Sequence, residues 1–198
     1  MAAFRDDAAL LGELTEMQTQ LKRCKSIVSG ILLSAGEARG ESAERTTVRG
    51  FLDGLVERWQ ASRPVRAFTY NNRIADDWPV ASDSALRQTV DNLLDNALEA
   101  SPDWVCFDAH IDERTLVLSV LDRGPGFAPS MLAQFGKPYQ STKGKPGGGL
   151  GLFLAVNVVR KLGGTVTATN RPEGGAVVML RLPMSAIELE EELTDAEP

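Results

Sequence analysis

The stretch that decides the fold runs from Asp122 to Leu152 and holds two glycine clusters. The first reads Asp122-Arg123-Gly124-Pro125-Gly126-Phe127, and the second reads Gly147-Gly148-Gly149-Leu150-Gly151-Leu152. An apolar run, 116–121, leads into the first cluster, and an apolar-periodic segment, 150–162, begins within the second. Glycine lets backbone N–H groups converge on an anion because no Cβ blocks the approach, and a helix start adds the positive end of its dipole. The stretch therefore indicates a phosphate site between a strand and a helix.

The segment 88–100 makes this indication specific. Its apolar residues recur at helical spacing and predict a buried stripe formed by Val90, Leu93, Leu94, Ala97 and Leu98. Asn92 and Asn96 lie four residues apart and so share one face of this helix. Because asparagine is a mediocre helix former, the pair needs an explanation. Either the two amides cap or solvate the helix, or they face Mg²⁺ and its phosphate-bound waters, since Mg²⁺ prefers hard oxygen ligands.

These motifs resemble those of the sensor histidine kinases, in the family's order, over residues 80–183. The run Asn92 to Ala97 is similar to the N box, and the two glycine clusters are similar to the first and second glycine boxes. The run Phe135 to Lys143 resembles the F box and the start of the ATP lid. The wider ATPase superfamily, with gyrase-type and Hsp90-type proteins, shares these features. Asn92 and the Ser-Thr-Lys lid favour the histidine-kinase branch.

The resemblance implies a Bergerat-type ATP-binding fold with ATP and Mg²⁺ as cofactors. It implies that Asp122 accepts a hydrogen bond from the adenine amino group, which suits a carboxylate because an ionised carboxylate only accepts. It makes Asn96 the principal Mg²⁺ ligand and Asn92 a second ligand or a neighbour of a bound water. Lys143 would meet the terminal phosphates as the lid closes, or is a structural lysine on a loop; Asn92 and Lys143 are the expected catalytic residues. The other residues expected to bind nucleotide are Gly124, Gly126, Tyr139, Ser141, Thr142, Gly147, Gly149, Leu150, Gly151 and Leu152.

The implied activity is that of a protein-histidine kinase. Such a domain positions Mg-ATP for phosphoryl transfer to a histidine on a helical hairpin, from which the group passes to an aspartate of a response regulator. The only histidine of the chain, His110, lies on the polar face of a strand-like run, where a solvated role is expected. We therefore expect that the chain does not autophosphorylate by itself. Two alternatives stay open: a nucleotide-switched interaction module and an anti-sigma-type serine kinase.

Residues 4–36 predict one long helix with a heptad seam, formed by Leu10, Leu14, Met17, Leu21, Cys24, Val28, Ile31 and Ala35. This regularity predicts a homodimer through residues 4–36, although packing on the chain's own domain would also use such a seam. Cys24 is the candidate redox residue, because neighbouring cations favour its thiolate whereas burial opposes it. The alternative is a small apolar filler. The run Arg23 to Ile27 resembles the redox-responsive RegB/PrrB-type kinases.

Composition and charge bound the remaining possibilities. With 198 residues, of which 43% are hydrophobic, the chain has enough material for one substantial core and an extra element. The net charge of −6 arises in residues 185–198, which hold six acidic and no basic side chains, so nothing suggests a nucleic-acid partner. Two cysteines make no disulfide framework, and no signal peptide or membrane span is visible. We expect a cytoplasmic location, with any membrane contact made by upstream segments.

Three segments are predicted. Residues 1–40 form the second helix of a dimerisation and phosphotransfer hairpin plus a linker, with the first, histidine-bearing helix absent. Residues 41–184 form the ATP-binding catalytic domain, and residues 185–198 an acidic disordered tail. Ser82 or Asp83 is expected to cap the asparagine-bearing helix. Strands on one side and helices on the other predict an α+β fold, a two-layer α/β sandwich preceded by the heptad-patterned helix.

Overall fold

The computed structural model describes residues 45–63, 65–137 and 150–189, together with the isolated positions Leu10, Gly12 and Met17. The chain divides into two compact units, Met1–Ala38 and Arg39–Pro198. Leu10 and Met17 have helical backbone, and their side chains are 57% and 62% exposed. Apart from these positions, the predicted helix over residues 4–36, Cys24 included, lies outside the described residues. The long helix and its seam therefore remain predictions.

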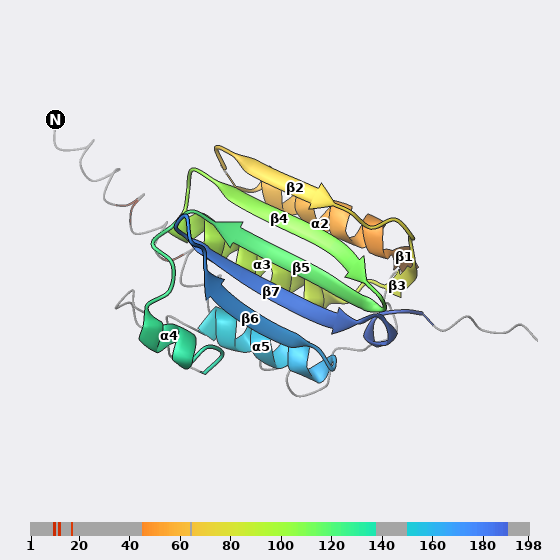
Figure 1. Ribbon diagram of the computed structural model, residues 1–198. Helices are drawn as coiled ribbons and strands as arrows, with labels where there is room; N and C mark the ends of the chain where they lie inside the picture. The colour runs from red at the N-terminus through yellow and green to blue at the C-terminus, as the bar shows by residue number, and fades with distance from the viewer. Residues whose placement is uncertain are drawn as a thin grey trace, which may run out of the picture. The chain divides into compact units, whose positions relative to one another are not determined.

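A five-stranded sheet forms the frame of the second unit, in the strand order β2-β4-β5-β7-β6 (Figure 1). Its strands are β2 (Phe68–Asn72), β4 (Val105–Asp112), β5 (Thr115–Asp122), β6 (Thr165–Asn170) and β7 (Ala176–Pro183). The pair β2–β4 is parallel, and the other neighbours are antiparallel. A second, two-stranded sheet pairs β1 (Arg45–Thr47) with β3 (Pro79–Ala81).

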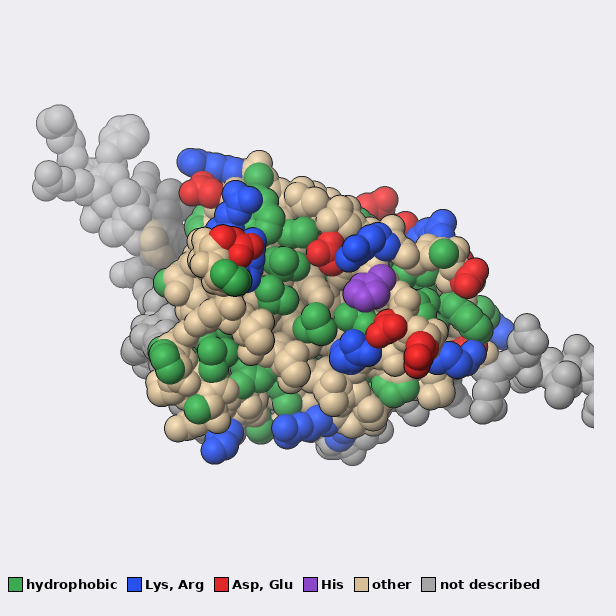
Figure 2. All heavy atoms as spheres, viewed as in Figure 1, with side chains coloured by type: hydrophobic (Ala, Val, Ile, Leu, Met, Phe, Trp, Pro, Cys, Tyr) green, Lys and Arg blue, Asp and Glu red, His purple; other side chains and the backbone are tan. Residues whose placement is uncertain are grey.

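Helices cover one face of the five-stranded sheet (Figure 1). They are α2 (Val48–Ala61), α3 (Ser84–Ala100) and α5 (Leu150–Lys161), and a short helix, α4 (Pro129–Ala133), follows the first glycine cluster. This arrangement confirms the predicted two-layer α+β sandwich. Figure 2 views the face that the helices leave uncovered, where charged, polar and hydrophobic side chains are mixed. None of the described helices is long and apolar enough to cross a membrane.

The core lies between the sheet and the helices because both layers alternate apolar and polar positions. In β4, Val105, Phe107 and Ala109 are fully buried against the helical layer. In α2 and α3 the apolar stripes face the sheet, so Trp59 and Leu94 are at most 1% exposed. Burial of these stripes fixes the rotation of α3, and with it the face that carries the two asparagines.

The C-terminal part of the packed unit extends beyond the predicted boundary. After the short 3₁₀ helix Met184–Ala186, Ile187 is buried, and its carbonyl accepts a hydrogen bond from Ala81 N at 3.1 Å. Leu189 N donates to Pro79 O, also at 3.1 Å. Residues 185–189, assigned above to the acidic tail, are therefore packed against β3, because an apolar side chain and backbone pairing outweigh the local acidic composition.

Candidate functional site

Helix α3 presents Asn92 and Asn96 beside a buried stripe, as predicted. The helix begins at Asp83, whose carboxylate accepts hydrogen bonds from Ala85 N at 2.7 Å and Leu86 N at 2.9 Å. Asn92 is half-buried and Asn96 is exposed. Neither amide side chain makes a hydrogen bond with the residues that the structure describes. Within the described part of the chain, the oxygen atoms of both amides are thus available for a ligand.

Asp95, which directly precedes Asn96 on α3, anchors the helix to α2. Its carboxylate accepts from Trp59 Nε1 at 2.8 Å and from Arg63 Nε and Nη2 at 2.8 and 2.7 Å. The hydrogen bond to Asp95 raises the pKa of the Arg63 guanidinium, and burial raises the pKa of the nearby Asp91 carboxyl. This contact was not predicted from the sequence. The feature that could have predicted it is a tryptophan on a buried stripe, because the indole N–H of a buried tryptophan needs a hydrogen-bond acceptor.

Asp122 lies at the end of β5 and is 8% exposed. One carboxylate oxygen, Oδ1, accepts from Gly124 N at 2.8 Å and from Ala176 N at 3.3 Å. No described residue donates to Oδ2. Because an ionised carboxylate oxygen only accepts hydrogen bonds, Oδ2 is the atom through which Asp122 is suited to meet a donor on a ligand.

The first glycine cluster is held between α3 and β6. A Cβ built on Gly124 would lie 2.6 Å from Ala100 O, so the loop passes directly over the last turn of α3. Gly126 has a φ of +73°, which favours glycine. The loop is also tied to β6, because Asn170 Oδ1 accepts from Phe127 N at 2.7 Å and Asn170 Nδ2 donates to Phe127 O at 2.8 Å.

The second glycine cluster leads into α5, which packs alongside α3. A Cβ built on Gly151 would have Asn96 Nδ2, at 3.9 Å, as its nearest neighbour. The start of α5 therefore faces the metal-ligand candidate of α3, and a Cβ at Gly151 would be in ordinary van der Waals contact with it. Leu152 is half-buried and packs against the core. The structure thus brings together Asn96 and Gly151 on one side of α3, and Gly124 with the end of the same helix.

Part of the expected site belongs to the segment between α4 and α5 and to the start of α5. Tyr139, Ser141, Thr142, Lys143, Gly147 and Gly149 lie outside the described residues, as does the side chain of Leu150. The described residues before this segment end at Lys137. Among them, Phe135 packs edge-to-face on Phe127, with ring centroids 6.1 Å apart.

The donor set suits Mg²⁺ only if a ligand supplies further oxygens. Within residues 45–63, 65–137 and 150–189, no group of three His, Cys, Asp or Glu side chains could hold a metal ion. Asn92 and Asn96 offer neutral amide oxygens, which are hard but uncharged. Because Mg²⁺ usually keeps several waters and is bound together with substrate phosphates, these amides fit a nucleotide-bound Mg²⁺ better than a free resident ion.

His110 lies on the sheet face that is not covered by the helices. It is half-buried, and its Nδ1 is buried without a hydrogen-bond partner among the described residues. The adjacent Asp108 accepts from Asn71 Nδ2 at 2.6 Å instead. His110 is therefore more enclosed than the solvated histidine expected from the strand pattern, because its neighbours in the sheet include the buried Val117.

Comparisons with known proteins identify the family of this domain. Residues 81–186 match the family described as histidine kinase-, DNA gyrase B- and HSP90-like ATPases. The C4-dicarboxylate transport sensor protein DctB of Pseudomonas aeruginosa is 41% identical over 181 residues, which cover 86% of this chain and 29% of DctB. The chain thus spans less than a third of this relative.

Solved structures share the fold. The mycobacterial sensor histidine kinase MprB is similar with a TM-score of 0.57 at 26% identity, over 71% of this chain and 97% of that chain. Full-length ShkA in complex with AMPPNP is similar with a TM-score of 0.66 at 23% identity, over 89% of this chain and 38% of that chain.

Proposed function

The chain belongs to the histidine kinase-, DNA gyrase B- and HSP90-like ATPases, as the ATP-binding catalytic domain of a sensor histidine kinase, and from this premise we propose how it handles ATP. Asp122 selects adenine, the backbone of the two glycine clusters binds the phosphates, and Asn96 with Asn92 binds Mg²⁺ at the nucleotide. The observation that carries this proposal is the convergence on α3 of the Gly124 loop and of Gly151.

Adenine selection follows from the chemistry of Asp122. With Oδ1 engaged by two backbone N–H groups, Oδ2 is left to accept from an exocyclic amino group. Guanine carries a carbonyl oxygen at the corresponding position and would face the carboxylate with a second acceptor. The family resemblance assigns Lys143 to the terminal phosphates. It assigns nucleotide binding, without a stated atom, to Tyr139, Ser141 and Thr142 in the same predicted region.

The side-chain amides of Asn92 and Asn96 on α3 are uncharged. They would orient the nucleotide without adding negative charge beside its phosphates. When bound, Mg²⁺ would neutralise phosphate oxygens and so favour phosphoryl transfer. Asn96 is exposed, its side chain lies next to Gly151, and it would be the principal Mg²⁺ ligand. Asn92 lies one turn earlier on the same face of the helix. We assign Asn92 and Lys143 to catalysis on the basis of the family resemblance.

The phosphoryl acceptor is proposed to be a histidine on a helical hairpin, and the final acceptor an aspartate of a response regulator. DctB, of which this chain covers 29%, is named a sensor protein. His110 is a poor acceptor, because its Nδ1 is buried within the catalytic domain itself. The chain by itself is therefore expected to bind Mg-ATP without autophosphorylation.

The first unit is proposed to provide the dimer contact. Residues 1–40 would form the second hairpin helix and linker, and 41–184 the catalytic domain, in a cytoplasmic protein with any membrane contact upstream. Exposed Leu10 and Met17, one heptad apart, support a partner for residues 4–36. A redox role for Cys24 rests on the neighbouring cations Arg23 and Lys25 and on the RegB/PrrB resemblance. Oxidation followed by non-reducing electrophoresis should give a dimer that Cys24→Ser abolishes.

Calorimetric titration of the chain with ATP, with and without Mg²⁺, tests the nucleotide site. We expect Asn96→Ala to remove the Mg²⁺-dependent part of the affinity and Asp122→Asn to weaken ATP by about tenfold or more. Arg66→Met, in an exposed ion pair with Asp103, serves as the control that leaves binding unchanged. Equal affinity of wild type and Asp122→Asn for ATP would refute the assignment of the adenine contact.

A further inference from the structure

The turn between β6 and β7, residues 171–175, lies against Asp122. Its backbone closes through Arg171 N donating to Gly175 O at 3.0 Å and Gly174 N donating to Arg171 O at 3.1 Å. Gly174 and Gly175 have φ values of +96° and +86°, which only glycine adopts readily. A Cβ on Gly175 would lie 2.0 Å from Asp122 O, so the turn packs on the main chain of Asp122 with no space for a side chain.

Arg171 makes a direct contact from this turn to Asp122. Its Nη1 donates to the Asp122 carbonyl oxygen at 2.8 Å. The same hairpin donates Ala176 N to Asp122 Oδ1. One hairpin therefore holds both the carbonyl and one carboxylate oxygen of Asp122, which restricts the rotation of the side chain and determines where Oδ2 can lie.

The Arg171 guanidinium is itself held in place. Only 12% of its side chain is exposed, its Nη2 donates to the Glu173 carboxylate, and it lies 5.1 Å from the centroid of the Trp104 ring. Arg123 lies over the same ring at 4.3 Å, but in the described part of the chain the side-chain hydrogen bond to the Asp122 carbonyl comes from Arg171. A planar guanidinium group held over an aromatic ring loses little conformational freedom on forming each hydrogen bond. Arg171 is therefore pre-organised for its contact with Asp122.

We propose that Arg171 is a positioning residue that sets adenine specificity, because its hydrogen bond to the Asp122 carbonyl, together with the Ala176 N–H on Oδ1, aims Oδ2 at the base. This inference rests on the proposed function and deepens it. Arg171 touches Asp122 rather than the nucleotide. It therefore acts on discrimination between bases, whereas a general effect of its positive charge on the phosphates would act on every nucleoside triphosphate alike.

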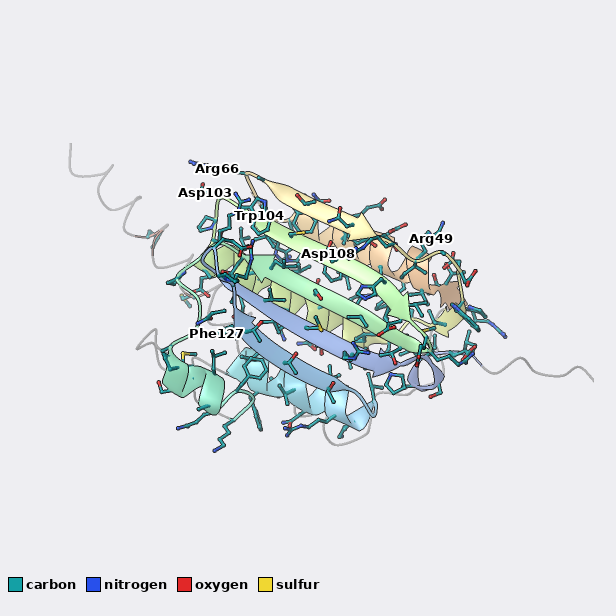
Figure 3. The ribbon with its side chains drawn as sticks, viewed as in Figure 1. Arg49, Arg66, Asp103, Trp104, Asp108 and Phe127 are labelled. Atoms are coloured by element: carbon teal, nitrogen blue, oxygen red, sulfur yellow. The ribbon has the colours of Figure 1, made fainter. Side chains whose placement is uncertain are left out.

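The test compares ATP with inosine triphosphate, which replaces the amino group of adenine with a carbonyl oxygen. Calorimetry with Mg²⁺ gives both dissociation constants for wild type and for Arg171→Met, Arg171→Lys, Asp122→Asn and Arg66→Met. The control Arg66 lies in the same corner of the molecule as Trp104 but in an exposed pair with Asp103 (Figure 3). Thermal unfolding of each variant separates a lost fold from a lost contact.

We expect Arg171→Met to weaken ATP about tenfold and to leave inosine triphosphate within about twofold of wild type. Arg171→Lys should retain part of the preference, since lysine supplies one donor without the fork. Arg66→Met should change neither constant.

The inference is overturned if Arg171→Met keeps the wild-type preference while Asp122→Asn loses it, or if Arg171→Met weakens both nucleotides equally. In those cases the proposed function still stands. If wild type binds neither nucleotide, or if Asp122→Asn keeps the full preference for ATP, the proposed function itself fails.

Discussion

Replacing Gly124 with alanine should destabilise the protein through a steric overlap whose size is set by the structure. The new Cβ would lie 2.6 Å from Ala100 O and 2.9 Å from Ala100 Cβ. Ordinary contact begins at 3.4 Å, so the first of these atoms is 0.8 Å too close (3.4 − 2.6). Both neighbours belong to the last residue of α3, which cannot move without disturbing the helix end. Overpacking of this kind costs about 2 kcal/mol.

Gly151 offers the matched comparison, because it belongs to the second glycine cluster. The nearest atom to an added Cβ is Asn96 Nδ2 at 3.9 Å, so alanine meets no clash there. Since Gly151 lies within α5, alanine should raise stability by up to about 1 kcal/mol. If phosphates approach the backbone at this point, the same methyl group obstructs them, and ATP affinity should fall although the fold is intact.

The assay is thermal unfolding followed by circular dichroism, with ATP titration of each variant. For a domain of this size we expect Gly124→Ala to unfold about 4–8 °C below wild type, and Gly151→Ala at or slightly above it. A Gly124→Ala protein as stable as wild type would show that the loop does not pass over α3 as described. Unchanged ATP affinity of Gly151→Ala would contradict the approach of phosphates to the start of α5.

Three further predictions concern contacts away from the nucleotide. Asp95→Ala leaves the buried Trp59 indole N–H without its acceptor and should lower the free energy of unfolding by about 2 kcal/mol, while Asp95→Asn, which keeps an acceptor, loses less in urea titrations. Burial raises the pKa of the Cys106 thiol from 9.0 to about 11, so between these pH values the folded state keeps a proton that the unfolded state releases. Between pH 9 and 11 wild type should therefore lose stability relative to Cys106→Ala. Parallel curves of unfolding free energy against pH for the two proteins would contradict this. Ile187→Ala should cost about 2–4 kcal/mol in the same urea titration if residues 185–189 are packed, whereas an unchanged midpoint would restore the predicted boundary of the tail.

The type of the longer elements was accessible from the sequence because their signal is local. The helical spacing around Asn92 and Asn96 predicted α3 and the face that both amides share, and the strand-like run that carries His110 predicted β4. Three short elements were missed: β1, α4 and the 3₁₀ helix Met184–Ala186. An element of three or five residues carries too little periodicity to stand out from a loop.

By itself the sequence determined the layers, the buried stripes and the residue types available to bind ATP, since each depends on neighbours within about one turn of helix or a few strand positions. Only the tertiary structure decided which distant residues support them. Antiparallel register between β5 and β7 pairs Leu121 with Val177, which brings the β6–β7 turn to Asp122, 49 residues before Arg171. Strand order and register arise from the packing of the whole sheet, and no local pattern around Arg171 encodes that contact.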